Sequence, residues 1–331
     1  MRGVRTGSAI EEFCRALSRE GVSCAREVPL SAYSTWRIGG PADALLEPAS
    51  RDQALIGLRE AARLGVPIAV IGRGSNLLMA DEGFRGVVFR LGPAMGQVAV
   101  DGLRVRAEAG ALAGRVARLA GQHDLTGLEH IVGIPGSMGG IVAMNAGSPP
   151  QSISDQLEWI DVVNRDGTLE RFETAQCQFA YRDSRFLHDD SWIILGCALR
   201  LTEGDSTEIR RAMRQSLLER RRKFPLRQPN CGSVFKSLPE LYELAGPPGR
   251  IIEDCGFKGR RVGGAQVSQL HANFIVNNGH ATASDVFTLI RAIRREVHAR
   301  HGYWMPTEVR YLRPEGGIVP AHVQADAAAS R

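Results

Sequence analysis

The spacing of apolar and polar residues predicts alternating helices and strands in the first 91 residues. Apolar residues recur at helical spacing within residues 8–20 and 51–64, which predicts two amphipathic helices. Short apolar runs over residues 42–47, 68–71 and 87–91 predict strands that are largely buried. Together these segments predict an α/β unit that follows an N-terminal helix.

From residue 92 the pattern changes to that of hairpins. Asp-Gly pairs at 101–102 and 166–167 lie between alternating apolar residues, which is typical of a tight β-hairpin turn. A further strand is predicted over residues 191–201 and a helix over residues 111–122. This second region is therefore predicted to be α+β with much antiparallel sheet.

A third region begins near Glu203. Helices are predicted over residues 206–222 and 283–300, with Thr282 or Ser284 as the N-cap of the second, and a strand near 308–312 closes the region. The residues after 313 lack periodicity and are predicted to be disordered. We therefore divide the chain into residues 1–91, 92–204 and 205–313 and a tail of residues 314–331.

Length and composition agree with a globular protein of two or three domains. The chain has 331 residues, of which 44 % are hydrophobic and 23 % are charged, values that exclude wholesale disorder and a coiled coil. No apolar run approaches the length of a membrane span, and the N-terminus lacks the apolar core of a signal peptide. We therefore expect a cytoplasmic protein without a membrane span.

Cysteines and histidines show no metal-binding pattern. The six cysteines contain no C-x-x-C pair, so we expect reduced thiols in packing roles. The eight histidines show no ligand spacing, and no metal site is expected. The cysteines are Cys14, Cys24, Cys177, Cys197, Cys231 and Cys255.

The net charge is +5, which is compatible with nucleic acid or with a small anionic ligand as the partner. Of 41 basic residues, only Lys223, Lys236 and Lys258 are lysines, and they lie in one stretch of the chain. A lysine that persists in such a chain is a candidate for a position where a compact ammonium is needed and the arginine fork does not fit. Chance is the alternative explanation.

Two glycine-rich segments predict backbone that approaches a phosphate. Residues 72–78 (GRGSNLL) directly follow a predicted strand, and residues 133–147 (GIPGSMGGIVAMNAG) contain small side chains that leave the backbone accessible. Leu77 breaks the G-x-G-x-x-G dinucleotide motif, and no P-loop occurs. Pro135 replaces the first glycine of a G-x-S-x-G nucleophile elbow, which argues against a hydrolase.

Taken together with further motifs, these segments resemble one family. The matching stretches run in order from residue 35 to residue 310: TWRIGGPA at 35–42, GRGSNLL at 72–78, GLE at 127–129, GIPGSMGG at 133–140 with MNAG at 144–147, YRDSRF at 181–186, GSVFK at 232–236, GRRVGGAQVSQLHANFIVN at 259–277 and EVR at 308–310. The sequence is similar to the UDP-N-acetylenolpyruvoylglucosamine reductase (MurB) family in its shorter form.

The resemblance implies an α+β protein in which an α/β and an α+β domain together bind FAD, with the fold of the vanillyl-alcohol-oxidase type, and a third α+β domain binds a UDP-sugar substrate. It implies hydride transfer from NADPH to noncovalently bound FAD and on to the enolpyruvyl group, which yields UDP-N-acetylmuramate for peptidoglycan precursor biosynthesis. The residues it assigns to FAD are Gly72, Arg73, Gly74, Ser75, Asn76, Gly133, Ile134, Pro135, Gly136, Gly139 and Gly140.

The resemblance also implies roles for individual side chains. Ser233 matches the proton donor, Arg182 the arginine that stabilises the substrate carboxylate, and Glu308 the catalytic glutamate. Three more residues match contacts to the substrate: Tyr181, Lys223 and Lys236. The chain departs from the family pattern at Ser148-Pro149-Pro150, at Ser237 and at Met305-Pro306-Thr307.

Two other interpretations remain. Arginines crowd residues 206–222, as in a nucleic-acid-binding helix, but no aromatic residue interleaves them, and two glutamates dilute their charge. A flavin oxidase of the same broader fold is the second alternative. Neither GRGSNLL nor GIPGSMGG contains a His or Cys that could hold flavin covalently, so releasable FAD is expected. We expect a monomer that binds a UDP-sugar and no nucleic acid.

Overall fold

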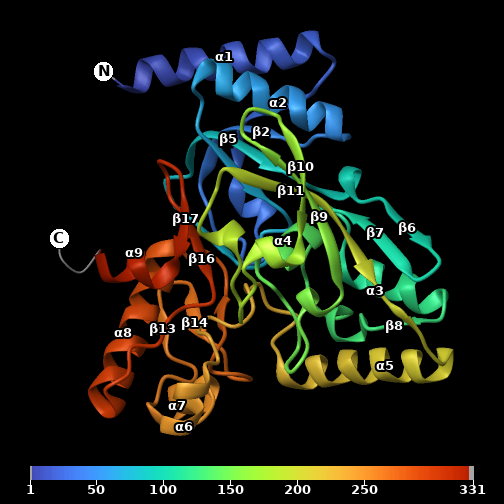
Figure 1. Cartoon of the computed structure of the whole chain (residues 1–331). Helices are drawn as coiled ribbons and strands as arrows, with labels where there is room; N and C mark the ends of the chain where they lie inside the picture. Colours follow the sequence, from blue (N-terminus) through green and yellow to red (C-terminus); the bar gives the residue numbers. More distant parts are fainter. Residues whose placement is uncertain (1, 328–331) are drawn as a thin grey trace. The chain divides into compact units, whose positions relative to one another are not determined.

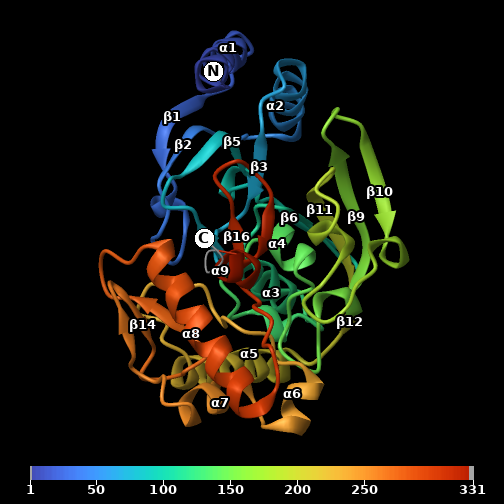
Figure 2. The same cartoon turned by 90° about the vertical axis from the view of Figure 1, so that its left-hand side faces the viewer.

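Local capping signals fix the helix ends in the N-terminal part of the chain. Helix α2 (Arg51–Leu64) begins after Ser50, whose side chain accepts a hydrogen bond from the Gln53 N–H, and ends at Gly65 in a left-handed conformation. It packs beside α1 (Arg2–Arg19), as Figure 2 shows. The computed structural model describes residues 2–327 of the chain (Figure 1).

The chain divides into two compact units, which differ from the predicted regions. Unit 1 comprises Met1–Val28, Asp43–Arg73 and Arg85–Arg220; unit 2 comprises Pro29–Ala42, Gly74–Phe84 and Arg221–Arg331. Both predicted FAD-binding regions thus contribute most of their residues to one unit. The short segments 29–42 and 74–84 join the C-terminal unit instead, and most of helix α5 (Ser206–Lys223) belongs to unit 1. Each unit is described by itself.

Two sheets form the framework of unit 1. The first has the order β1 (Cys24–Pro29), β2 (Pro41–Leu46), β5 (Phe84–Arg90), β3 (Ile68–Ile71), and β3 runs parallel to β5. The second is antiparallel, with the order β10 (Leu169–Glu173), β9 (Leu157–Asn164), β11 (Trp192–Arg200), β7 (Arg104–Glu108), β6 (Val98–Asp101). Both predicted hairpins are present in the second sheet.

Helices and a small ribbon complete unit 1. Helix α3 (Ala113–Gln122) and the short helix α4 (Met138–Ala143) bury apolar side chains in the same core as the two sheets. Strands β8 (Leu125–Thr126) and β12 (Thr202–Glu203) pair before α5 begins. Short 3-10 helices occur at Leu30–Tyr33, Pro93–Met95, Glu129–Ile131, Ile153–Asp155, Thr174–Cys177 and Arg185–Leu187.

Unit 2 is built from two small sheets and four helices within the part of the chain that the structure describes. One sheet has the order β13 (Arg261–Val262), β14 (Ala265–Val267), β15 (Ile275–Asn277), and the other β17 (Ile318–Pro320), β16 (Arg310–Leu312), β4 (Leu77–Met79). The helices are α6 (Pro239–Leu244), α7 (Pro248–Asp254), α8 (Ala283–His301) and α9 (Ala321–Ala327). Thr282 caps α8, which decides between the two predicted N-caps.

The predicted disorder of the tail is wrong for its described residues. Strand β17 pairs antiparallel with β16, and α9 buries Ala321 and Ala325 against the core of unit 2. A three-residue strand and a seven-residue helix are too short to produce a periodic signal in the sequence. Residues 328–331 lie outside the described part of the chain.

The expectation of six reduced thiols is also corrected. Cys14 and Cys24 form a disulfide, with their Cα atoms 5.5 Å apart. The spacing of ten residues in sequence matched no known motif, and only the fold brings the two cysteines together. The other four cysteines are buried, and burial raises the pKa of Cys231 to about 11.

Residues 2–327 contain no group of three His, Cys, Asp or Glu side chains arranged to hold a metal ion. None of the helices in the same residues has both the length and the apolar character that a bilayer crossing requires.

Candidate cofactor and substrate site

The two glycine-rich segments approach each other in unit 1. Strand β3 ends at Ile71, and a Cβ built on Gly72 would lie only 2.1 Å from the Ser137 Oγ. Ser137 is buried, and its Oγ has no hydrogen-bond partner among the described residues. Because buried hydroxyls normally have a partner, this hydroxyl is a candidate donor to an oxygen of a ligand or of water. Glycine at position 72 thus allows the two segments to pack closely, and we call this contact, together with residues 133–140, the cradle.

Several N–H groups of the second segment are already bonded to backbone carbonyls, so they shape the segment and do not point to a ligand. The N–H groups of Ile134, Gly136 and Gly139 donate to the carbonyls of Ile131 (3.0 Å), Ile134 (2.9 Å) and Ala109 (2.9 Å). These bonds hold the segment in place around the start of α4. Gly139 also packs tightly, because a Cβ there would lie 3.1 Å from the Cβ of Ala109. Three of the predicted FAD-binding residues therefore shape the cradle through their backbone.

Helix α5 places the side chain of Arg220 against the second segment. The sequence analysis did not predict this contact. The Arg220 side chain packs against Gly133, where any Cβ would lie 2.5 Å from the arginine Cδ. Burial lowers the pKa of Arg220, and the positive charge of Arg182 lowers it further. Two neighbouring arginine charges favour an anionic ligand. Nothing in the run of arginines distinguishes Arg220 from its neighbours, so the sequence had no signal for it.

The MNAG motif orients Arg182. Its Nη2 donates to the Gly147 carbonyl at 2.7 Å and its Nη1 to the Asn145 carbonyl at 3.3 Å. The Asn145 amide donates in turn to the carbonyl of Ala180 at 2.9 Å, which fixes the chain just before Tyr181. The Arg182 Cζ lies 5.2 Å from the centroid of the Tyr181 ring. These carbonyl partners orient the guanidinium, whose planar fork suits recognition of a carboxylate.

In unit 2, the end of the first glycine loop is fixed by two other family motifs. The Thr35 N–H donates to the Gly74 carbonyl at 3.2 Å, and the Cys231 thiol donates to the Leu77 carbonyl at 3.3 Å. Gly74 has a φ of +64°, and a Cβ there would lie 2.1 Å from the Tyr33 carbonyl oxygen. The conformation of the loop by itself therefore requires glycine at position 74, whether or not a phosphate approaches it.

Ser233 lies on a backbone that is fixed on both sides. The Gly232 N–H donates to the side chain of Asn230 at 2.9 Å. Asn273 accepts from the Val234 and Phe235 N–H groups, both at 2.9 Å. Ser233 precedes no helix, so it is not a capping serine, and its hydroxyl forms no hydrogen bond to any residue between 2 and 327.

Glu308 lies beside both the Ser233 loop and the first glycine loop. Its N–H donates to the Val234 carbonyl at 2.8 Å, and its carbonyl accepts from the Asn76 amide at 3.1 Å. The Arg310 N–H then donates to the Asn76 carbonyl at 3.1 Å, where β16 begins to pair with β4. Unit 2 therefore brings Asn76, the residue after Ser233 and Glu308 into one hydrogen-bonded set.

The three lysines differ in their surroundings. The Lys236 N–H donates to the Pro306 carbonyl at 3.0 Å, close to Glu308. Lys223 is exposed at the end of α5, and Lys258 forms an ion pair with Glu253 at 2.8 Å. Burial lowers the pKa of His271, and the charges of Lys258 and Lys223 contribute in the same direction. Lys258 thus forms an ion pair, and the substrate contacts of Lys223 and Lys236 stay predictions.

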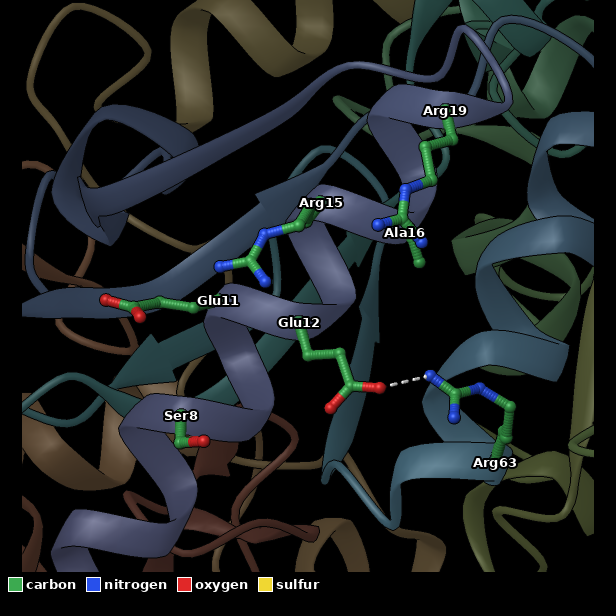
Figure 3. Close-up of a pocket in the computed structure, with 7 residues that line it drawn as sticks. All are labelled: Ser8, Glu11, Glu12, Arg15, Ala16, Arg19 and Arg63. Carbon is green, nitrogen blue, oxygen red and sulfur yellow. Dashed lines mark hydrogen bonds and ion pairs between the residues drawn. The ribbon is translucent and has the colours of Figure 1, made fainter.

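A groove between α1 and α2 contains none of the predicted site residues (Figure 3). Its charged residues include Glu12 and Arg63, which form an ion pair at 2.7 Å. Both side chains are about half exposed, at 52 % and 54 %, so the pair is well solvated. The groove is an ionic contact between two surface helices. Its lining residues are Ser8, Glu11, Glu12, Arg15, Ala16, Arg19 and Arg63.

Comparison with known proteins identifies the family. Residues 42–173 match the FAD binding domain family, and residues 224–312 match the C-terminal domain of UDP-N-acetylenolpyruvoylglucosamine reductase. The reductase 1 of Corynebacterium glutamicum is 40 % identical over 91 % of this chain and 90 % of its own. The chain belongs to the UDP-N-acetylenolpyruvoylglucosamine reductase family. The reductase of Heliobacterium modesticaldum is 42 % identical over 89 % of this chain and 92 % of its own.

A solved structure of the family agrees with the fold. The MurB crystal structure from Thermus caldophilus matches with a TM-score of 0.74 and 32 % identity, over 88 % of this chain and 98 % of that chain. This match and the FAD binding domain confirm the predicted α+β fold class. The match to the C-terminal domain ends at residue 312, before β17 and α9.

Proposed function

We propose that the chain reduces the enolpyruvyl group of UDP-N-acetylglucosamine enolpyruvate to give UDP-N-acetylmuramate, with FAD as cofactor and NADPH as hydride donor. The observation that carries the proposal is the hydrogen-bonded set of Asn76, the Ser233 loop and Glu308 in a chain of this reductase family. The reaction would serve peptidoglycan precursor synthesis in the cytoplasm and, through the cell wall, cell shape and division.

The residues of the cradle fit a noncovalently bound FAD. Gly72 packs directly against Ser137, and Ser137 has a buried hydroxyl that a phosphate oxygen would satisfy. Neither glycine-rich segment contains a His or Cys for a covalent link. When bound, the flavin supplies the hydride-transfer chemistry, and the protein supplies orientation and electrostatics. The charge of Arg220 at Gly133 favours the same anionic group.

The chemistry of the substrate explains the need for the three predicted catalytic residues. Hydride addition to carbon 3 leaves negative charge on carbon 2 and the adjoining carboxylate. Arg182, oriented by two carbonyls, would stabilise this charge with its planar fork. The Ser233 hydroxyl, on its fixed loop, would deliver the proton to carbon 2, and Glu308 would act beside it. Tyr181, Lys223 and Lys236 would contact the UDP-sugar.

Anaerobic half-reactions test the proposal. NADPH should bleach the flavin absorbance of the purified protein, and the enolpyruvyl substrate should restore it. Ser233→Ala should retain flavin reduction but slow reoxidation by roughly 10²- to 10⁴-fold, the usual contribution of general acid catalysis. Ser284→Ala, in the first turn of α8, is the matched control and should behave as wild type. Failure of the substrate to reoxidise the wild-type flavin would exclude the proposed function.

A further inference from the structure

The described part of the tail contacts the residues that directly follow Glu308. Strand β17 and helix α9 lie beyond the family's C-terminal domain match, which ends at residue 312. The Ala321 N–H donates to the Val309 carbonyl at 3.0 Å, and the Arg310 Nη2 donates to the Ile318 carbonyl at 2.5 Å. The residues on the C-terminal side of Glu308 are therefore bonded to the tail.

His322, on α9, holds the residue on the other side of Glu308. The Thr307 N–H donates to the His322 Nδ1 at 3.1 Å, and the Thr307 Oγ1 lies 2.9 Å from the same nitrogen. The His322 N–H donates to that Oγ1 at 3.2 Å, so the hydroxyl accepts from the backbone and donates to the ring. Thr307 is buried, and these contacts satisfy both its polar backbone donor and its side chain.

An ion pair anchors α9 on α8. Arg294, on α8, is only 5 % exposed, and its Nε donates to the Met305 carbonyl at 2.8 Å. Its Nη1 pairs with the carboxylate of Asp326 on α9. The segment Met305-Pro306-Thr307 is thus held by α8 at its first residue and by α9 at its last. This is the same segment in which the sequence departs from the family pattern.

We propose that His322 is a positioning residue for Glu308, acting through Thr307. We call the hydrogen bonds between Thr307 and His322 the clamp. The clamp fixes the residue that directly precedes Glu308, while Val234 and Asn76 fix the Glu308 backbone itself. Loss of the clamp would let the segment shift, and a displacement of about 1 Å at a catalytic group costs on the order of 10²-fold in rate. The inference rests on the proposed role of Glu308.

The clamp requires a neutral imidazole, because a protonated Nδ1 has no lone pair to accept the Thr307 N–H. Burial lowers the pKa of His322 to about 4, and the charges of Arg294 and Lys236 act in the same direction, while Asp326 opposes them. The ring is therefore neutral at neutral pH, and Nδ1 accepts from Thr307 when the ring proton is on Nε2.

The first test measures coupling between His322 and Glu308. His322→Ala should slow flavin reoxidation by the substrate roughly 10- to 100-fold, with flavin content, KM and reduction by NADPH near wild type. In a Glu308→Gln background, the same change should cost less than about threefold, because the two effects share one route. His322→Asn, whose Oδ1 can accept in place of Nδ1, should restore most of the rate. Val323→Ala, an exposed change on the same helix, is the control.

The second test measures the contact between Thr307 and His322 directly and does not depend on enzyme activity. In amide hydrogen exchange on the purified holoprotein, the Thr307 amide should exchange faster in His322→Ala than in wild type and be protected again in His322→Asn. Equal rate losses in both backgrounds, or reoxidation unaffected by His322→Ala while Glu308→Gln slows it, would overturn the positioning role alone. Wild-type reoxidation in Glu308→Gln would instead refute the proposed role of the glutamate.

Discussion

The unpartnered hydroxyl of Ser137 allows cofactor binding to be separated from folding. Ser137 precedes α4 but makes no side-chain capping bond, so Ser137→Ala removes no interaction from the chain itself. A buried polar group without a partner costs about 1–3 kcal/mol. We therefore expect the FAD-free Ser137→Ala protein to be as stable as wild type or more stable, although most substitutions in a buried segment destabilise.

FAD binding should become weaker in Ser137→Ala, although the stability of the FAD-free protein is kept or increased. A hydrogen bond to a charged group contributes about 1.5–3 kcal/mol. If the Ser137 hydroxyl donates to a phosphate oxygen, its loss should weaken FAD binding roughly 10- to 100-fold, since 1.4 kcal/mol corresponds to a factor of ten. The predicted variant is thus a stable protein that releases its flavin more readily than wild type.

Flavin fluorescence on titration of the FAD-free protein gives the dissociation constant, and thermal or urea unfolding gives the stability. Ser50→Ala is the matched control, because it removes the N-cap of α2 and should cost about 1 kcal/mol of stability without altering the FAD affinity. Wild-type FAD affinity in Ser137→Ala, or a loss of stability as large as in Ser50→Ala, would refute the assignment of the cradle.

Four further predictions concern other residues of the chain. If a compact ammonium is needed, Lys223→Arg should raise KM or lower turnover about tenfold, near 1.4 kcal/mol, in steady-state kinetics; unchanged kinetics would make the lysine a bystander. Arg182→Lys loses the fork that reaches two carbonyls and should slow reoxidation about 100-fold in stopped flow. Asp81→Ala should lower the unfolding free energy by about 1–2 kcal/mol in urea, because the carboxylate accepts from two N–H groups at the start of α8. Stability should fall as pH drops from 6.5 to about 4, since the unfolded chain takes up a proton that folded His322 resists, and pH-dependent melting of His322→Asn should show a shallower fall.

Periodic segments and turn pairs could be predicted because their signals are local. The predicted bounds of α2 and β3 agree with the structure, and both Asp-Gly hairpins form. Short elements such as α7 and β14 were missed, since seven or three residues carry too little periodicity and owe their conformation to packing in unit 2. Elements that lack a clear apolar pattern were therefore missed even when they are longer, as with the six-residue β1.

Some features of the candidate site could also be predicted from the sequence, and others could not. The glycine-rich segments could be found because backbone close to a phosphate restricts residue type. The sequence could not show that Gly74 is required by contact with the Tyr33 carbonyl, or that Asn273 fixes the Ser233 loop. Both contacts join residues far apart in the chain, and one sequence contains no trace of such a pairing. From residue identity alone, packing and ligand binding therefore remained competing explanations for the glycines and for the Ser233 loop.

The arginine run of α5 shows why net charge alone could not distinguish nucleic acid from a small anion. Arg211 forms an ion pair with Glu208, and Arg210 donates to the hydroxyl of Ser206, so part of the run is engaged within its own helix. Arg220 instead lies against Gly133, in the segment that shapes the cradle. Residues of one type in one helix therefore differ in what they contact. The positive charge of Arg220 acts on the glycine segment, where a diphosphate is the better match than an extended polyanion.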